Sequence, residues 1–372
     1  MSGTKIIATI GPASESEESL LSLIQAGATL FRFNLKHNSP DWHRTVIHRL
    51  REVSQKHSKP IAFIADIPNR ESISQWLDEL KDCQLEYVAL SFIKSVDDVV
   101  ALRDELSKHS NPARIIGKIE TNEALSYVEE IIHESHAIMV ARGDLGRALP
   151  IEEVPYYQKR IITRCLEVGK PVITATEMLE SMIENPTPTR AEVSDVANAM
   201  YDWTDAVMLS AETAMGKHGA DAVSVMKRVA AFTDDKRPGP KLSFAVKNQT
   251  DALTLAAHDL ARQRVIEEQR IKAFIVITTT GQTAQSLSRL RPYIPIIAVT
   301  PQELVCNQLN LLWGVTPIVY RLQEGEKEVE INHLRETLLS SSLVSHGEHV
   351  ILLYGNEVGV AGNTNVLRIE TI

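Results

Sequence analysis

The sequence predicts an α/β fold in which a (β/α)8 barrel is followed by a smaller C-terminal α/β domain. Short apolar runs rich in β-branched residues alternate with amphipathic stretches from residue 5 to residue 212. Strands buried on both faces form such continuous apolar runs, and helical segments between successive strands imply right-handed parallel crossovers. A polar segment rich in Pro and Gly follows, and a second alternating pattern begins beyond it. We therefore expect two separate cores.

The number of strand-like runs favours a closed TIM barrel. Eight of them fall within about 210 residues, as expected for eight β/α units. An open, doubly wound sheet remains the alternative, because strand count alone does not exclude it. The helical segment 16–25 has acids in its first turn and Gly27 after its end. The predicted strands are residues 5–10, 28–34, 61–67, 87–92, 114–120, 137–142, 171–176 and 206–212.

The domain boundaries follow from the polar segment. We assign residues 1–232 to the barrel and its active site, 233–247 to a linker, and 248–372 to the C-terminal domain. The second pattern predicts a helix over residues 249–268. Its predicted strands lie near residues 272–278, 296–300, 315–320, 349–354 and 365–369.

Composition excludes several classes of protein. The 372 residues are 44% hydrophobic and 23% charged, which is typical of a soluble globular protein. A net charge of −9 without a basic stripe argues against a nucleic-acid partner. Cys83, Cys165 and Cys306 are too far apart for a metal or disulfide pattern, as expected in a reducing cytosol. We see no signal segment and no run of membrane-spanning length, so we predict a cytoplasmic protein without a membrane partner.

Polar and charged residues concentrate where the predicted strands end. The active site of a (β/α)8 barrel lies at the C-terminal ends of its strands, whereas most other inward positions are apolar. Random placement of polar residues would not favour one rim so strongly. The residues at these ends are Arg32, Asn34, Asp66, Lys118, Glu120, Asp144, Thr176 and Glu212.

Two of these residues suggest a site for a phosphate and a metal. Lys118 and Glu120 are two positions apart on a strand, so their side chains share a face. Glu120 and Asp144 offer hard oxygen ligands, and Mg²⁺ typically takes one or two carboxylates together with substrate oxygens. An internal ion pair explains Lys118 and Glu120 equally well when they are considered alone.

The turn at residues 141–146 passes from a strand into a helical segment. Free backbone N–H groups near Gly143 can hold a substrate carboxylate. A glycine-dependent connection capped by Asp144 is the structural alternative. Thr176, at the end of the seventh predicted strand, either donates a hydrogen bond to substrate or bonds to backbone.

Taken together, these segments resemble the pyruvate kinase family over nearly the whole chain. Several family signatures occur in the right order, which makes the resemblance specific. The matching stretches are residues 4–14, 32–34, 117–120, 139–146, 171–179, 185–192, 194–199 and 208–214.

The resemblance implies a function and a set of partners. The reaction would be transfer of a phosphoryl group from phosphoenolpyruvate to ADP, which gives pyruvate and ATP. Glu120 and Asp144 would bind Mg²⁺ or Mn²⁺, and Lys118 and Arg32 would hold the phosphoryl group. The family resemblance also suggests a homo-oligomer, namely a tetramer.

The resemblance assigns two further groups of residues. Thr176, together with the backbone of Gly143 and Asp144, would hold the substrate carboxylate. His37 and Asn34 are candidate residues on the nucleotide side of the site.

The sequence departs from the family first at the lid. Family members carry a β-rich lid domain after the third strand, whereas here residues 64–70 run directly into a segment that resembles the helix after the lid. Two alternatives to the kinase reaction therefore stay open. One is metal-dependent enolpyruvate or oxaloacetate chemistry without transfer, and the other is a non-catalytic sensor of phosphoenolpyruvate or a sugar phosphate.

The second departure concerns the family's potassium site. Asn34 and Asp66 match that site, but Lys36 and Ile67 stand where a serine and a threonine are usual. We expect that potassium is not required.

The third departure lies in the C-terminal domain. A possible effector phosphate loop survives in part, with Gln282 where many members have a charged residue. A plain strand-to-helix turn is the alternative interpretation. The residues of this loop that can bind phosphate are Thr278, Thr280, Gly281 and Thr283.

Overall fold

The computed structural model describes residues 3–240, 244–262, 271–320, 331–355 and 364–372, with the side chains of 331 and 332 left aside. The described residues divide into two compact units, one ending at Arg237 and the other beginning at Pro238.

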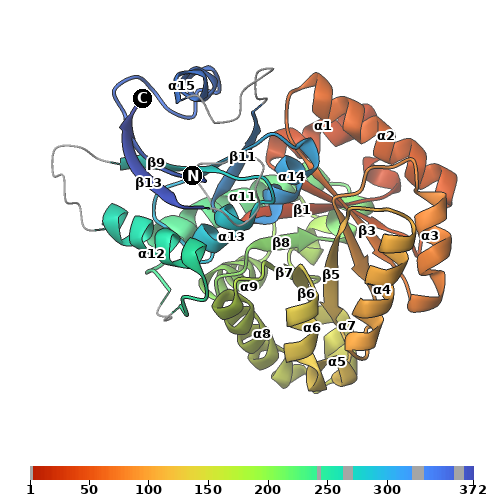
Figure 1. Ribbon diagram of the computed structural model, residues 1–372. Helices are drawn as coiled ribbons and strands as arrows, with labels where there is room; N and C mark the ends of the chain where they lie inside the picture. The colour runs from red at the N-terminus through yellow and green to blue at the C-terminus, as the bar shows by residue number, and fades with distance from the viewer. Residues whose placement is uncertain (1–2, 241–243, 263–270, 321–330, 356–363) are drawn as a thin grey trace. The chain divides into compact units, whose positions relative to one another are not determined.

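The first unit is a closed barrel of eight parallel strands in sequence order, and β8 pairs with β1 to complete the ring. Figure 1 shows the strands at the centre with helices around them. This confirms the predicted barrel, and the open-sheet alternative is wrong. The strands are β1 (Lys5–Ile10), β2 (Leu30–Asn34), β3 (Ala62–Ile67), β4 (Tyr87–Leu90), β5 (Arg114–Ile119), β6 (Ala137–Ala141), β7 (Val172–Ala175) and β8 (Ala206–Leu209).

The helices of this unit lie between or after the strands. Local signals set their ends: Ser16 caps α1 by accepting a hydrogen bond from the Ser19 amide, and Gly27 closes the helix with a positive φ. The helices are α1 (Glu17–Ala26), α2 (Pro40–Lys56), α3 (Ile73–Glu79), α4 (Val96–Lys108), α5 (Asn122–Ser126), α6 (Val128–Glu134), α7 (Arg142–Ala148), α8 (Val154–Val168), α9 (Arg190–Tyr201), α10 (Ala211–Ala214) and α11 (Gly219–Lys236).

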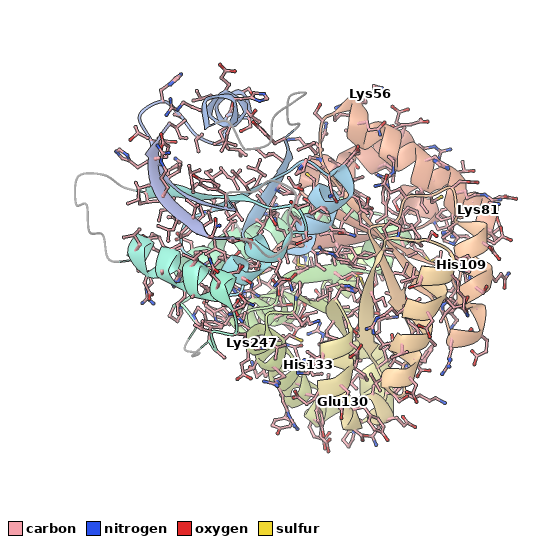
Figure 2. All side chains as sticks on the ribbon, viewed as in Figure 1. Lys56, Lys81, His109, Glu130, His133 and Lys247 are labelled. Atoms are coloured by element: carbon pink, nitrogen blue, oxygen red, sulfur yellow. The ribbon has the colours of Figure 1, made fainter. Side chains whose placement is uncertain are left out.

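Alternation along the strands separates two environments. Phe31, Phe33 and Phe63 belong to the core between strands and helices. Because side chains alternate across a strand, Arg32 and Asp66 point into the barrel instead. The labelled Lys56 and His133, by contrast, lie on the outer helices α2 and α6, and the labelled His109 directly follows α4 (Figure 2). The alternation therefore decides which polar side chains reach the barrel mouth.

The connection after β3 is short. Residues 68–72 alone join β3 to α3, and a single 3-10 turn, Arg70–Ser72, occupies most of this link. The Asn69 side chain accepts a hydrogen bond from the Ser72 amide at 3.0 Å, and Arg70 pairs with Asp98 at 3.1 Å. No domain is inserted within these described residues.

The predicted linker begins too early, because α11 continues through Lys236. Asp234 belongs to this helix and is almost completely buried. Its carboxylate accepts hydrogen bonds from the Gly3 and Thr4 amides and pairs with Arg237 at 2.7 Å. Asp234 and Arg237 therefore belong to the barrel unit, whereas Asp235 and Lys236 between them are exposed.

The second unit is a five-stranded sheet with the order β11-β10-β9-β12-β13, in which only β13 is antiparallel to its neighbour. Separate apolar clusters cover its two faces, one with α12 and α13 and the other with α15 (Figure 1). Residues 263–268 of the predicted helix lie outside the described residues. The elements are α12 (Gln249–Arg262), β9 (Ile271–Ile277), α13 (Gln282–Ser288), β10 (Ile296–Thr300), α14 (Glu303–Gln308), β11 (Val315–Val319), α15 (Ile331–Ser340), β12 (His349–Tyr354) and β13 (Val366–Thr371).

Among the helices described in either unit, none is both long and apolar enough to cross a membrane.

Candidate active site

A buried charged cluster occupies the C-terminal mouth of the barrel. The Lys118 ammonium lies 3.1 Å from an oxygen of Asp66 and 2.7 Å from Oε1 of Glu120. Arg32 reaches the same Asp66 carboxylate, with Nε 2.7 Å from Oδ2. Each of these side chains is at most 11% exposed, so water screens the charges little. Two cations and two carboxylates thus hold one another in place.

Strand order explains why these residues meet. In the barrel β2, β3, β4 and β5 are consecutive neighbours, and Asn34 pairs in register with Asp66. The carboxyl ends of adjacent parallel strands lie along one rim, so Arg32, Asp66 and Lys118 point toward the same space. The cluster is therefore a product of strand register.

Glu120 also fixes an unusual backbone position. Its Oε2 accepts a hydrogen bond from the Phe92 amide at 2.7 Å. Phe92 has a φ of +56°, which is rare for a non-glycine residue, and its side chain is 48% exposed. Glu120 therefore links the lysine of β5 to the strained loop that follows β4.

The two carboxyl groups of the cluster have opposite pKa shifts. Burial alone would raise the pKa of Asp66, but Lys118 and Arg32 outweigh it and hold the pKa below its ordinary value. Burial raises the pKa of Glu120, and Lys118 only partly opposes that effect. The two neighbouring cations thus outweigh burial at Asp66, whereas burial outweighs the single neighbouring lysine at Glu120.

A second group of predicted residues lines a cleft of about 220 Å³ at the ends of β6, β7 and β8. Within it, the Gly143 amide donates a hydrogen bond to Thr176 Oγ1 at 2.7 Å. Asp144 is partly exposed and has one long contact, 3.4 Å to Arg147. Glu212 accepts hydrogen bonds from the Ser210 and Leu179 amides, so its role is to hold the loops.

The residues predicted for the monovalent cation and the nucleotide lie around the β2–α2 loop. The Asn34 side chain accepts a hydrogen bond from the Lys36 amide at 3.2 Å, while the Lys36 side chain is exposed. His37 is also exposed, and its carbonyl contacts His43 Nε2 at 2.7 Å. Asp66 is used by Arg32 and Lys118, as described above.

In the C-terminal unit, the predicted phosphate loop forms a turn between β9 and α13. Thr278 Oγ1 accepts a hydrogen bond from the Gly281 amide at 2.9 Å, and Gly281 has a φ of +85°. Thr283 Oγ1 lies 2.6 Å from Thr364 Oγ1, and Thr280 is exposed. The buried hydroxyls of the loop are thus used within the protein.

Sequence reasoning missed two members of the barrel cluster. Ser91 receives a hydrogen bond from Lys118 at 2.6 Å and donates one to Asp66 at 3.0 Å. Thr9 accepts a hydrogen bond from Arg32 at 3.3 Å. Both follow the same signal as the residues that were predicted, because each is a polar residue at or near the end of an apolar strand.

Comparison with known proteins identifies one family in both units. Family models match in both units: "Pyruvate kinase, barrel domain" covers residues 1–79 and 79–223, and "Pyruvate kinase, alpha/beta domain" covers 257–370. A pyruvate kinase of Staphylococcus epidermidis is 31% identical over 475 aligned positions, which include the whole of this chain and 81% of that protein. A pyruvate kinase of Sporosarcina psychrophila is 32% identical over 483 positions, with the same two shares.

The fold and the cluster define a (β/α)8-barrel protein with paired cations and carboxylates at its C-terminal rim and a separate α/β domain. The matches to both family models place it more narrowly: the chain belongs to the pyruvate kinase family. The alignments are longer than the 372 residues of the chain, so the relatives contain residues that it lacks.

We expect Asp66→Asn to lower the free energy of unfolding by about 3 kcal/mol at pH 7, because Arg32 and Lys118 would lose a buried countercharge. The pKa of Asp66 is lowered in the folded protein, so its contribution is present above the ordinary value of 3.8 and is lost below it. Chemical denaturation should therefore show the same difference at pH 7 and pH 5. A difference that disappears by pH 5 would contradict the lowered pKa.

Proposed function

We propose that the protein catalyses metal-dependent transfer of a phosphoryl group from phosphoenolpyruvate to ADP, without a lid domain. The observation that carries this proposal is the buried cluster of Arg32, Lys118, Asp66 and Glu120 at the barrel mouth in a member of the pyruvate kinase family. The test is a lactate dehydrogenase-coupled assay with phosphoenolpyruvate, Mg²⁺ and each nucleoside diphosphate. Pyruvate release that depends on the nucleotide supports the proposal, and no release with any nucleotide contradicts it.

The charge balance of the cluster supports a role for a divalent cation. Arg32 and Lys118 are matched by Asp66 and Glu120, so the cluster has no net formal charge with which to attract an anion. Phosphoenolpyruvate carries a phosphate and a carboxylate. A divalent cation would give the site the positive charge that such a substrate needs.

Glu120 and Asp144 fit such a cation by their chemistry. Glu120 is a buried carboxylate with a raised pKa, which added positive charge would stabilise in its ionised form. Asp144 is partly exposed in the neighbouring cleft. The described residues contain no group of three or more His, Cys, Asp or Glu that could hold a metal, so substrate and water would complete the ligands, as is usual for Mg²⁺.

The protein groups would divide the remaining work. Arg32 and Lys118 would hold the phosphoryl group and stabilise its charge as it moves, while Thr176 and the Gly143 backbone would orient the carboxylate. The divalent metal, when bound, would act as a Lewis acid toward substrate oxygens. Lys118 is well placed for its role because Asp66, Ser91 and Glu120 fix its ammonium from three sides.

The open rim favours a second candidate function, enolpyruvate chemistry without efficient transfer. The groups that would stabilise an enolate all belong to the barrel, whereas residues 68–72 offer little to enclose a nucleotide. Oxaloacetate decarboxylation belongs to this class, because it also passes through pyruvate enolate. The proposed kinase reaction therefore depends on how well the open rim positions ADP.

We expect the protein to bind oxalate, an enolate analogue, only when Mn²⁺ or Mg²⁺ is present. Glu120→Gln should abolish this binding because it removes a charged ligand while keeping the side-chain shape. Glu123→Gln, a nearby exposed position, is the matched control and should bind normally. Isothermal titration calorimetry measures all three proteins. Equal oxalate affinity in EDTA would refute the metal assignment.

We also expect activity to be the same in potassium and tetramethylammonium salts. Lys36 would supply a tethered positive charge near Asn34, so recruitment of a free ion would be unnecessary. The variant Lys36→Ser, at an exposed position, restores the hydroxyl that is usual in the family and should become dependent on potassium. Steady-state rates in the two salts decide the matter, and a large, saturable potassium stimulation of the unmutated protein would argue against this role.

We expect the absence of a lid to slow phosphoryl transfer to ADP more than it slows enolisation of pyruvate. Positioning of reactants can account for roughly 7–11 kcal/mol of a barrier, and an open rim loses part of this for ADP but not for pyruvate. NMR of deuterium exchange at the pyruvate methyl group, with Mg²⁺ and inorganic phosphate, measures enolisation. The coupled assay on the same sample measures transfer, which we expect to be weak with a high KM for ADP. Rapid transfer at low ADP would show that another part of the protein replaces the lid.

A further inference from the structure

Two consecutive residues at the end of β7 have a backbone conformation that L-amino acids avoid. Thr176 has a φ of +70° and Glu177 a φ of +54°. Thr176 is β-branched, and for such residues a positive φ is a genuine outlier. Conformations of this kind persist only where surrounding groups hold them, and they cluster at functional sites. The structure must therefore contain groups that keep this turn in place.

The Arg142 side chain holds the turn from the neighbouring β/α unit. Its Nη2 donates hydrogen bonds to the carbonyl oxygens of both strained residues, at 2.7 Å for Thr176 and 3.2 Å for Glu177. The next residue, Gly143, donates its amide to Thr176 Oγ1 at 2.7 Å. Thr176 is thus bound at both its carbonyl and its hydroxyl by adjacent residues of one segment.

Arg142 is itself fixed by side chains of two helices, α8 and α9. Its Nη1 lies 2.7 Å from Asp195 Oδ2 on α9 and 3.4 Å from Gln158 Oε1 on α8. The Arg142 residue is 8% exposed, so these bonds are largely shielded from water. Only a guanidinium presents several donors in a rigid planar fork, and a lysine cannot replace that geometry.

We propose that Arg142 is a positioning residue that holds the Thr176–Glu177 turn and so keeps Thr176 within reach of the substrate carboxylate. The Thr176 hydroxyl now donates to the Ala175 carbonyl at 2.6 Å, and it would have to turn from that carbonyl to donate to the substrate. The claim that Thr176 contacts a substrate carboxylate rests on the proposed function. Arg142 does not touch the reacting atoms and acts through Thr176. This explains two features of the sequence that the proposed chemistry does not use, the arginine before Gly143 and the aspartate of the 194–199 segment.

Lys159 provides a control, because it is a cation that lines the same groove as Arg142. Arg142 lines a groove of about 470 Å³ together with Lys159, which pairs with Asp202 across its surface. Lys159→Gln removes an ion pair from this groove without touching the turn. Arg142→Lys keeps the positive charge but loses the fork. A difference between these two variants therefore reports on the hydrogen bonds from Arg142 to the Thr176–Glu177 turn rather than on the charge of the groove.

The first measurement is oxalate affinity in the presence of Mn²⁺, by calorimetry. Arg142→Lys should weaken oxalate binding about tenfold, as expected for loss of charge-assisted hydrogen bonds, and Lys159→Gln should not. Thr176→Val should also weaken binding. In the double variant Arg142→Lys with Thr176→Val, the affinity should equal that of Thr176→Val alone, because Arg142 acts through the hydroxyl of Thr176. Additive losses, or normal affinity in Arg142→Lys, would overturn the proposal.

The second measurement needs no ligand. Amide hydrogen exchange at Gly143 and at residues 177–179 should become faster in Arg142→Lys and stay unchanged in Lys159→Gln. Unchanged amide exchange rates in Arg142→Lys would refute the claim that Arg142 holds the turn. If the unmutated protein binds no oxalate, the proposed function fails, and the exchange result still decides whether Arg142 holds the turn.

Discussion

The Lys118 ammonium lies between the buried carboxylates of Asp66 and Glu120, and the arrangement of the barrel mouth depends on this contact. Isolated charges at this depth would be costly, so each member of the cluster needs the others. Through Asp66 the lysine is coupled to Arg32, and through Glu120 to the strained backbone of Phe92. One cation thus orders the ends of the strands from β2 to β5.

This mutual dependence explains why the site is preorganised. Arg32 and Lys118 are held in fixed positions by their ion pairs, so in the proposed phosphoryl transfer they would not need to reorganise. Burial raises the pKa of Glu120, and a divalent cation bound there as proposed would oppose that effect. The cluster is therefore complete as a structural unit but electrostatically prepared for a further cation and an anion.

The strained turn at Thr176 is a second fixed point on the same rim, and it is stabilised differently. Hydrogen bonds from Arg142 and Gly143 hold it, rather than a network of opposite charges. The connection at residues 68–72, by contrast, is a single short turn. The rim therefore combines fixed side chains at the charged cluster and at Thr176 with a short connection after β3. The proposed separation of enolisation from transfer rests on this contrast.

The sequence by itself determined the eight strands of the first domain, the five strands of the C-terminal sheet and the short link after β3, because the hydrophobic period and the turn residues are local properties. The pairing of β8 with β1, which closes the barrel, came from the tertiary structure. The sequence also identified Arg32, Asp66, Lys118 and Glu120 as neighbours at one rim, since strand ends and side-chain alternation can be read from the chain. Only the tertiary structure decided which atoms meet. Ser91 joins Lys118 to Asp66, Asp234 anchors the N-terminal strand, and Arg142 reaches the Thr176 turn from another β/α unit. These contacts join residues far apart in the chain, and they depend on strand register and helix packing, which no local pattern specifies.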